Sequence, residues 1–315
     1  MNARAWAELL RLPALFTVPG DALAGAAAVS ARPGRRTLQA IGSSLCLYEA
    51  GMALNDWADR QEDAVERPHR PIPSGRVQPA AALMAACAFT AAGLVLASRA
   101  GRPALAVATP LAATVWAYDL KLKHTPAGPV AMAAARGLDL LLGAAATRPA
   151  PGATRRALPS AALLSAHTLA LTTVSRRETT GGAALPPLAA LVTTGALGFL
   201  LSRELPAGRG AAVTPGLPGI GAAAPRPSRA SRLRLPFPLG SALTAAYTAV
   251  AARPYFHATL NPSPALTQRA VGGGIRATIP LQAALSARAG APVTALLTAA
   301  LAPLAAKFAK KVSVT

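Results

Sequence analysis

The sequence predicts an all-α protein whose helices form a bundle inside a membrane. Of its 315 residues, 52% are hydrophobic and 14% are charged, whereas a typical soluble domain carries about 25% charged residues. The apolar residues form continuous Ala/Leu runs, most of them close to the ~17–25 residues that a transmembrane helix needs. A closed β-barrel, the other structure that spans a bilayer, needs alternating apolar and polar residues instead.

Nine apolar runs are expected to form the helices, and on length alone they predict seven to nine spans. The first run follows Arg4 and Arg11 and is interrupted at Pro19-Gly20-Asp21. It lacks a clear small-residue cleavage site, so we expect a retained helix rather than a signal peptide. Asp21 either faces a cavity or caps a broken helix. The runs are 13–31, 38–58, 79–98, 103–119, 128–146, 157–174, 184–201, 238–252 and 276–305.

We expect residues 1–315 to form one integral membrane domain. The segment 202–236 is rich in Gly, Pro and Arg and shows little apolar periodicity. This composition predicts a long flexible loop between two helices.

The chain is strongly basic, with 32 Lys+Arg against 12 Asp+Glu and a formal net charge of +20. In a soluble protein this charge would suggest nucleic acid, but here the arginines cluster in loops between apolar runs. We therefore expect them to contact anionic lipid headgroups, with no nucleic-acid partner. Basic loops such as 60–76 and 119–124 favour the cytoplasmic side for this end of the bundle. The bias towards Ala and Arg favours a bacterial cytoplasmic membrane.

Three aspartates stand at the end of the second apolar run. Asp56, Asp59 and Asp63 fall within an arc of about 60° on one helix face. Carboxylates this close repel each other unless a cation lies between them, and a hard divalent cation that also holds a phosphate would serve. The alternative is that they are solvated charges among lipid headgroups. Ionisable residues at membrane depth are costly and usually functional, which favours the metal–anion site.

A basic, proline-rich turn follows this acidic cluster and would bind the same phosphate. Together the two segments resemble the first aspartate-rich motif of the UbiA family of intramembrane prenyltransferases. The motif reads Asn55-Asp56-x-x-Asp59-x-x-x-Asp63, then Arg67-Pro68-x-Arg70-Pro71-Ile72-Pro73-Ser74-Gly75-Arg76. Further along, Tyr118-x-x-Lys121-x-Lys123 is similar to the second-loop pattern of that family, so the resemblance covers most of the chain. Within the family, the chain resembles the EboC-like branch most closely.

The resemblance implies a bundle of about nine helices around a central cavity, with an isoprenoid diphosphate bound at its cytoplasmic mouth through Mg²⁺. It implies Mg²⁺-dependent transfer of a prenyl group, an alkyl group other than methyl, to a small aromatic or lipid-like acceptor. The catalytic and metal-binding residues would be Asp56, Asp59 and Asp63. The residues that contact the substrate would be Asn55, Arg67, Arg70, Tyr118, Lys121 and Lys123.

The chain departs from the family pattern after the sixth apolar run, where a second aspartate-rich motif is expected. Residues 171–182 contain one acidic residue, Glu178, beside Arg176 and Arg177. Arg176 is expected to contact the diphosphate directly in place of a second cation. Alternatively, this segment is an ordinary basic loop. The missing motif also favours a second function for the whole protein, that of a non-catalytic membrane carrier of a hydrophobic metabolite.

Three further acidic or basic residues lie in or beside apolar runs. Arg136 and Asp139 are spaced i, i+3, which predicts an ion pair unless they line the cavity. Asp119 would close a helix end near Lys123. The sequence does not identify the base that takes the proton from the acceptor.

Overall fold

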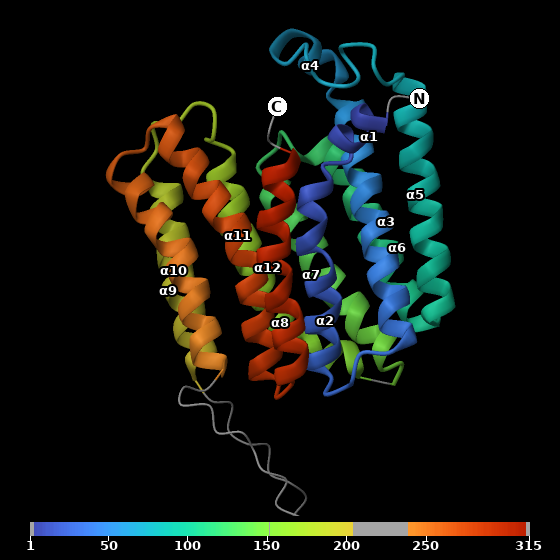
Figure 1. The fold of residues 1–315 in the computed structure, drawn as a ribbon, viewed down its shortest axis with the longest axis vertical. Helices are drawn as coiled ribbons and strands as arrows, with labels where there is room; N and C mark the ends of the chain where they lie inside the picture. The colour runs from blue at the N-terminus through green and yellow to red at the C-terminus, as the bar shows by residue number, and fades with distance from the viewer. Residues whose placement is uncertain (1–2, 151, 204–238, 313–315) are drawn as a thin grey trace, which may run out of the picture.

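The computed structural model describes residues 3–150, 152–203 and 239–312, and it confirms the all-α prediction (Figure 1). No β-strand occurs in these three ranges. The described helices are α1 (Ala3–Leu9), η1 (Leu12–Thr17, a 3₁₀ helix), α2 (Pro19–Ala28), α3 (Arg35–Ala58), α4 (Arg60–Glu66), α5 (Pro79–Ala100), α6 (Arg102–Ala117), η2 (Tyr118–Leu122, a π-helix), α7 (Gly128–Thr147), α8 (Ala153–Ser175), α9 (Leu185–Ser202), α10 (Leu239–Leu260), α11 (Pro264–Arg288) and α12 (Pro292–Val312).

The expected count of about nine helices is not confirmed, because the described residues form twelve α-helices. The first apolar run, 13–31, is divided between η1 and α2, since Pro19 cannot continue a helix but suits its first position. The last run, 276–305, is divided between α11 and α12. Gly290, with φ 77°, lies in the turn between them.

Four of the described helices, α5, α7, α8 and α9, are long and apolar enough to cross a membrane. Two shorter apolar segments, Leu15–Ala28 and Pro292–Lys307, accompany them. The loop expected at 202–236 lies almost entirely outside the described residues, which end at 203 and resume at 239.

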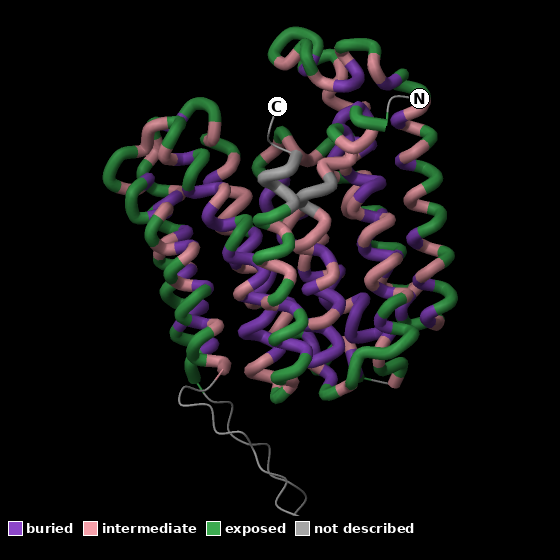
Figure 2. The backbone as a smooth tube through the Cα atoms, in the orientation of Figure 1, coloured by how far each residue is buried: buried purple, intermediate pink, exposed green. Residues whose placement is uncertain are grey.

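The long helices lie side by side in one bundle (Figure 1). Helix α5 forms one edge and packs on α3, while α9 and α10 form the opposite edge and pack on each other and on α11. Helix α2 packs against α7 and α11 between these edges. Buried residues gather along the inward faces of the helices (Figure 2).

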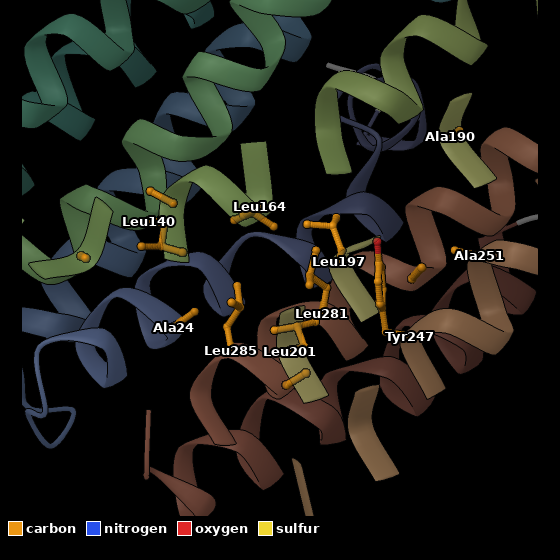
Figure 3. Close-up of a cluster of buried hydrophobic side chains, with 14 of the residues drawn as sticks. Ala24, Leu140, Leu164, Ala190, Leu197, Leu201, Tyr247, Ala251, Leu281 and Leu285 are labelled. Atoms are coloured by element: carbon orange, nitrogen blue, oxygen red, sulfur yellow. The ribbon is translucent and has the colours of Figure 1, made fainter. Parts of the chain in front are cut away.

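The largest buried cluster joins α2, α7, α8, α9, α10 and α11 (Figure 3). Leu140, Leu164, Leu281 and Tyr247 are fully buried there. A second cluster joins α2, α3, α5, α6 and α7 and consists mainly of alanines. Small residues allow helix backbones to approach closely, which is the main source of attraction between helices in lipid.

Helices α2 and α7 come closest at two glycines. A Cβ added to Gly25 would lie 2.1 Å from the carbonyl oxygen of Leu140, and one added to Gly143 would lie 2.4 Å from the Cα of Ala22. Both distances are too short for real atoms, so the crossing requires glycine at these positions. The close crossing holds Asp21 of α2 against the polar side chains of α7.

We predict that Gly143→Ala lowers the free energy of unfolding by about 1–3 kcal/mol, because the methyl group must push α2 and α7 apart. The measurement is an unfolding titration with sodium dodecyl sulfate in mixed micelles. Gly195→Ala in α9 is the matched control, since no atom lies within 4 Å of its added Cβ. The control should be neutral or slightly stabilising because alanine favours helix. Equal unfolding free energies for the two variants would contradict the prediction.

Candidate functional site

The candidate site lies at the end of the bundle where α3 gives way to α4, close to α1 (Figure 1). Helix α3 ends at Ala58 and α4 begins at Arg60, with Asp59 between them. The proline-rich segment after α4 folds back on itself, and the Ser74 hydroxyl donates to the carbonyl oxygen of Arg70 at 2.6 Å. This turn brings the Arg70 side chain back to the aspartates.

Asp56 and Asp63 are buried and share one cation. Arg70 Nη1 lies 2.7 Å from Asp63 Oδ2 and 3.6 Å from Asp56 Oδ1. Arg11 Nη2 donates to Asp56 Oδ1 at 3.1 Å, and Arg67 Nη1 donates to Asp63 Oδ1 at 3.4 Å. Three arginines therefore neutralise two carboxylates that would otherwise be too costly to bury.

Asp59 points to a different set of partners. It forms an ion pair with Lys123, whose side chain is 10% exposed, and its Oδ1 lies 3.8 Å from His124 Nε2. One ligand atom each from Asp59, Glu62 and His124 lie within 4.8 Å of one another. This is the single group of three possible metal ligands found in the described residues. Its two carboxylates suit a hard cation such as Mg²⁺, whereas the imidazole is a less usual ligand for it.

The three predicted metal ligands therefore lie where α3 meets α4 but do not converge on one point. Asp56 and Asp63 face Arg70, while Asp59 faces Lys123. The carboxylates meet the chemical requirement for Mg²⁺, and their metal-binding role stays a prediction.

Arg11 belongs to the site, although sequence reasoning did not assign it there. It connects α1 to η1 in the left-handed conformation, with φ 47° and ψ 46°. Such a conformation is uncommon for a residue with a side chain and is often found at functional sites. Here it turns the chain so that the guanidinium reaches Asp56. The sequence signal was an arginine directly before the first apolar run.

The amino-terminal helix is held against the site by a second ion pair. Arg76 Nη1 lies 2.7 Å from Glu8 Oε2, and Arg76 Nη2 lies 3.2 Å from Glu8 Oε1. The hydrogen bonds from Arg76 hold the pKa of Glu8 below its usual value, and Glu8 in turn raises the pKa of Arg76. This bidentate pair joins α1 to the turn that carries Arg70.

A cavity of about 250 Å³ lies in the bundle, and its mouth is the end lined by Arg11 and Asn55. Asp56, Asp59 and Asp63 are not among its lining residues, but Arg11 pairs with Asp56. Ser44 and Asn55 of α3 both line it and lie about 16 Å apart along the helix axis, at 1.5 Å per residue. Its walls are mainly apolar, and it carries polar groups towards each end. The lining residues are Arg11, Ser44, Leu47, Tyr48, Gly51, Met52, Asn55, Leu111, Val115, Tyr118, Asp119, Met132, Ala135, Arg136 and Asp139.

The deep end of the cavity contains a buried polar network that corrects one prediction. Arg136 does not pair with Asp139; its Nε lies 3.0 Å from Asp21 Oδ2, across the α2–α7 crossing. Gln282 of α11 donates to Asp21 Oδ1 at 2.6 Å. Asp139 instead accepts a hydrogen bond from Ser44. Asp21 neither caps a helix nor lines the cavity. It forms an ion pair with Arg136, which does line the cavity.

Of the four remaining predicted substrate contacts, two line the cavity and two do not. Asn55 and Tyr118 line the cavity. Arg176 donates a hydrogen bond to the carbonyl oxygen of Thr125 and lies within electrostatic range of Tyr118. Lys121 is exposed and forms no ion pair with any described residue.

The loop after α8 also reaches this end of the molecule. Burial raises the pKa of Glu178, and nearby Arg67 acts in the opposite direction. Glu178 is thus the acidic residue of residues 171–182 that approaches the site, and it does so beside an arginine.

Comparison with known proteins identifies a matching family and several relatives. The profile of the UbiA prenyltransferase family matches residues 14–191. Digeranylgeranylglyceryl phosphate synthase of Methanopyrus kandleri is 38% identical over 155 residues, which are 47% of this chain and 55% of that protein. The bacteriochlorophyll synthase 33 kDa chain of Rhodobacter capsulatus is 39% identical over 69 residues, or 22% of this chain and 23% of that one. The alignments span about half or less of these relatives.

Solved structures of UbiA homologs share the fold at low sequence identity. A homolog from Aeropyrum pernix superposes with a TM-score of 0.62 at 17% identity, covering 86% of this chain and 96% of that one. A homolog from Archaeoglobus fulgidus bound to GPP and Mg²⁺ gives a TM-score of 0.51 at 14% identity, covering 96% and 99%. The family profile covers more than half of the chain and agrees with the fold and the aspartate motif. This chain belongs to the UbiA prenyltransferase family.

Proposed function

We propose that the protein transfers a prenyl group from an isoprenoid diphosphate to a small lipid-like or aromatic acceptor within the membrane. The observation that carries this proposal is a mainly apolar cavity of about 250 Å³ with Arg11 and Asn55 in its wall, next to the acids and cations that surround Asp56 and Asp59. The cavity suits a hydrocarbon chain, and the mouth suits its charged diphosphate.

The chemistry requires the allylic C–O bond to break while the departing diphosphate is neutralised. In this proposal Arg70 and Lys123 contact the diphosphate, and Arg11, Arg67 and Arg176 add positive charge around it. The ammonium of Lys123 has three donors and one ion pair, so donors remain for phosphate oxygens. When bound, Mg²⁺ would offset further negative charge, with Asp56, Asp59 and Asp63 holding it. The apolar walls then exclude water from the prenyl cation.

The acceptor is proposed from the relatives rather than from the cavity. Several of them are digeranylgeranylglyceryl phosphate synthases, so a glyceryl phosphate lipid carrying one geranylgeranyl chain is the first acceptor to test. An aromatic acceptor is the second. We further propose that the chain belongs to the EboC-like branch of the family.

The family consists of integral membrane proteins, which agrees with four described helices long enough to span a bilayer. We propose that residues 1–315 form a single membrane domain whose mouth faces the cytoplasm of a bacterial cell. Loops around the mouth, such as 60–76 and 119–124, are basic, as the positive-inside rule expects of cytoplasmic loops. Loops at the opposite end are basic too, so a labelling test of Cys variants at both ends would decide the orientation.

The proposed activity is tested by measuring diphosphate release from geranyl, farnesyl and geranylgeranyl diphosphate with Mg²⁺ and the purified protein. Asp59→Asn should lower the rate by about 10²-fold, because the variant weakens both Mg²⁺ binding and the placement of Lys123. Removal of Mg²⁺ by a chelator should have a similar effect. Glu66→Gln, an exposed neighbour on α4, is the control and should keep the parental rate.

The alternative function is a carrier for a hydrophobic metabolite. Residues 171–182, with Glu178 as their one acidic residue, favour it because they cannot form a second aspartate motif. A parent protein that releases no diphosphate but moves a lipophilic compound across vesicles would establish the carrier and refute the transferase.

A further inference from the structure

We propose that Asp119 is the general base that takes the proton from a hydroxyl acceptor. This inference rests on the proposed prenyl transfer and adds the residue that completes it. Asp119 lines the cavity and is 4% exposed. It lies within electrostatic range of Lys123 and Arg11, two of the cations proposed to neutralise the diphosphate. The bond that changes is next to the diphosphate, so Asp119 is close to the reacting carbon.

The backbone at Asp119 is specialised for this position. Residues Tyr118–Leu122 form a π-helix, in which the amide of Lys123 donates to the carbonyl oxygen of Tyr118 at 3.0 Å. A π-turn is a rare insertion in a helix and occurs often at functional sites. Its wider turn places Asp119 among the cavity-lining residues and Lys123 opposite Asp59.

The facing helix leaves the Asp119 carboxylate uncovered. The residue opposite is Gly51 of α3, and a Cβ added there would lie 3.8 Å from Asp119 Oδ2 and 3.0 Å from Val115 Cγ1. Since Gly51 has no side chain, the space in front of the carboxylate stays part of the cavity. An acceptor hydroxyl can therefore approach it.

Asp119 also differs from the neighbouring carboxylates in being unengaged. Asp56 and Asp63 bind arginines, Asp59 pairs with Lys123, and Asp139 accepts a hydrogen bond from Ser44. By contrast, no hydrogen bond or ion pair to Asp119 occurs among residues 3–150, 152–203 and 239–312. A base must have a free lone pair, and Asp119 is the cavity-lining carboxylate that keeps both of its oxygens free.

The proposed step balances in atoms and electrons. The C1–O bond of the donor breaks, and its electron pair leaves with the diphosphate. A lone pair of the acceptor oxygen forms the new bond to C1. The electron pair of the O–H bond returns to that oxygen while its proton moves to the Asp119 carboxylate. The proton then passes to water at the mouth, which restores the carboxylate.

The test uses Asp119→Asn with a glyceryl phosphate lipid carrying one geranylgeranyl chain and, separately, with azide as the nucleophile. Azide is an anion with no proton to lose, so it needs no base. We expect transfer to the lipid hydroxyl to fall about 10²–10⁴-fold while prenyl azide formation stays at the parental level. Glu66→Gln is the control for replacing a nearby carboxylate by an amide. An unchanged melting temperature checks that the variant is folded.

The other outcomes are decisive. If Asp119→Asn loses azide trapping together with lipid transfer, Asp119 acts on the donor, and the base assignment is wrong. If the variant transfers to the lipid at the parental rate, Asp119 has no part in the reaction. If the parent itself releases no diphosphate with any donor, the proposed transferase function fails, and the base assignment falls with it.

Discussion

Replacement of Arg70 by leucine is expected to lower kcat/KM for the isoprenoid diphosphate by about 10³-fold. A single nitrogen of Arg70 lies 2.7 Å from Asp63 and 3.6 Å from Asp56. Its loss would leave two buried carboxylates facing each other with less neutralisation, and the incoming diphosphate would meet repulsion in place of attraction. The measurement is Mg²⁺-dependent diphosphate release as a function of donor concentration.

Two further variants make the Arg70 result specific. Arg70→Lys keeps the charge but loses the planar fork that bridges two carboxylates, so its rate should be intermediate. Arg60→Leu removes another arginine of the same segment, one that lies over the Trp57 ring at 4.4 Å and donates to its carbonyl oxygen. This control should keep the parental kcat/KM. Equal losses in Arg60→Leu and Arg70→Leu would mean that net charge, and not the position of Arg70, controls the site.

Arg136→Leu is expected to lower the free energy of unfolding by about 3–5 kcal/mol. Asp21 is fully buried, and Arg136 is the one cation with which it pairs in the described residues. Removing the guanidinium would leave Asp21 in the bundle with the Gln282 amide and the acidic side chain of Asp139 as partners and with no cation to neutralise it. The measurement is an unfolding titration in mixed micelles.

A second substitution distinguishes the effect of the unpaired carboxylate from the effect of lost side-chain packing. Adding Asp21→Asn to Arg136→Leu removes the unpaired carboxylate and should recover part of the lost stability. Arg148→Leu, at the exposed end of the same helix, is the matched control because the one hydrogen bond of its side chain, to the carbonyl oxygen of Val29, is 3.4 Å long. It should change stability by less than about 0.5 kcal/mol. Failure of the double variant to recover stability would show that Arg136 acts through packing alone.

The parts of the site that the sequence predicted are those held together locally. Asp56, Asp59 and Asp63 are within eight residues of one another, and Arg67 and Arg70 follow within one short turn. Helix geometry and a proline-rich turn are enough to bring these side chains to one end of the bundle. The resemblance to a known motif added Tyr118, which lines the cavity.

The parts that the sequence did not predict depend on pairing between distant helices. Arg11 pairs with Asp56, which is 45 residues away in the sequence. Arg136 pairs with Asp21 in α2 and not with Asp139, which lies one turn along its own helix. The i, i+3 spacing on one helix identifies a possible local partner but carries no information about a partner on another helix. The close crossing of α2 and α7 brings Asp21 to Arg136, and it depends on Gly25 and Gly143, which follow no periodic pattern in the sequence.

Every residue that lines the cavity belongs to residues 11–139, while α8, α9, α10 and α11 form the largest packed cluster with α2 and α7. The amino-terminal part of the chain therefore forms the walls of the cavity, whereas the later helices contribute mainly to packing. We expect substitutions among the cavity-lining residues to alter which substrate fits, whereas most volume-preserving substitutions in the packed cluster of α8–α11 should leave the cavity unchanged. Gln282, which donates to Asp21, is an exception. A chimera that combines the first seven helices of one family member with the last five of another should inherit its substrate choice from the amino-terminal parent.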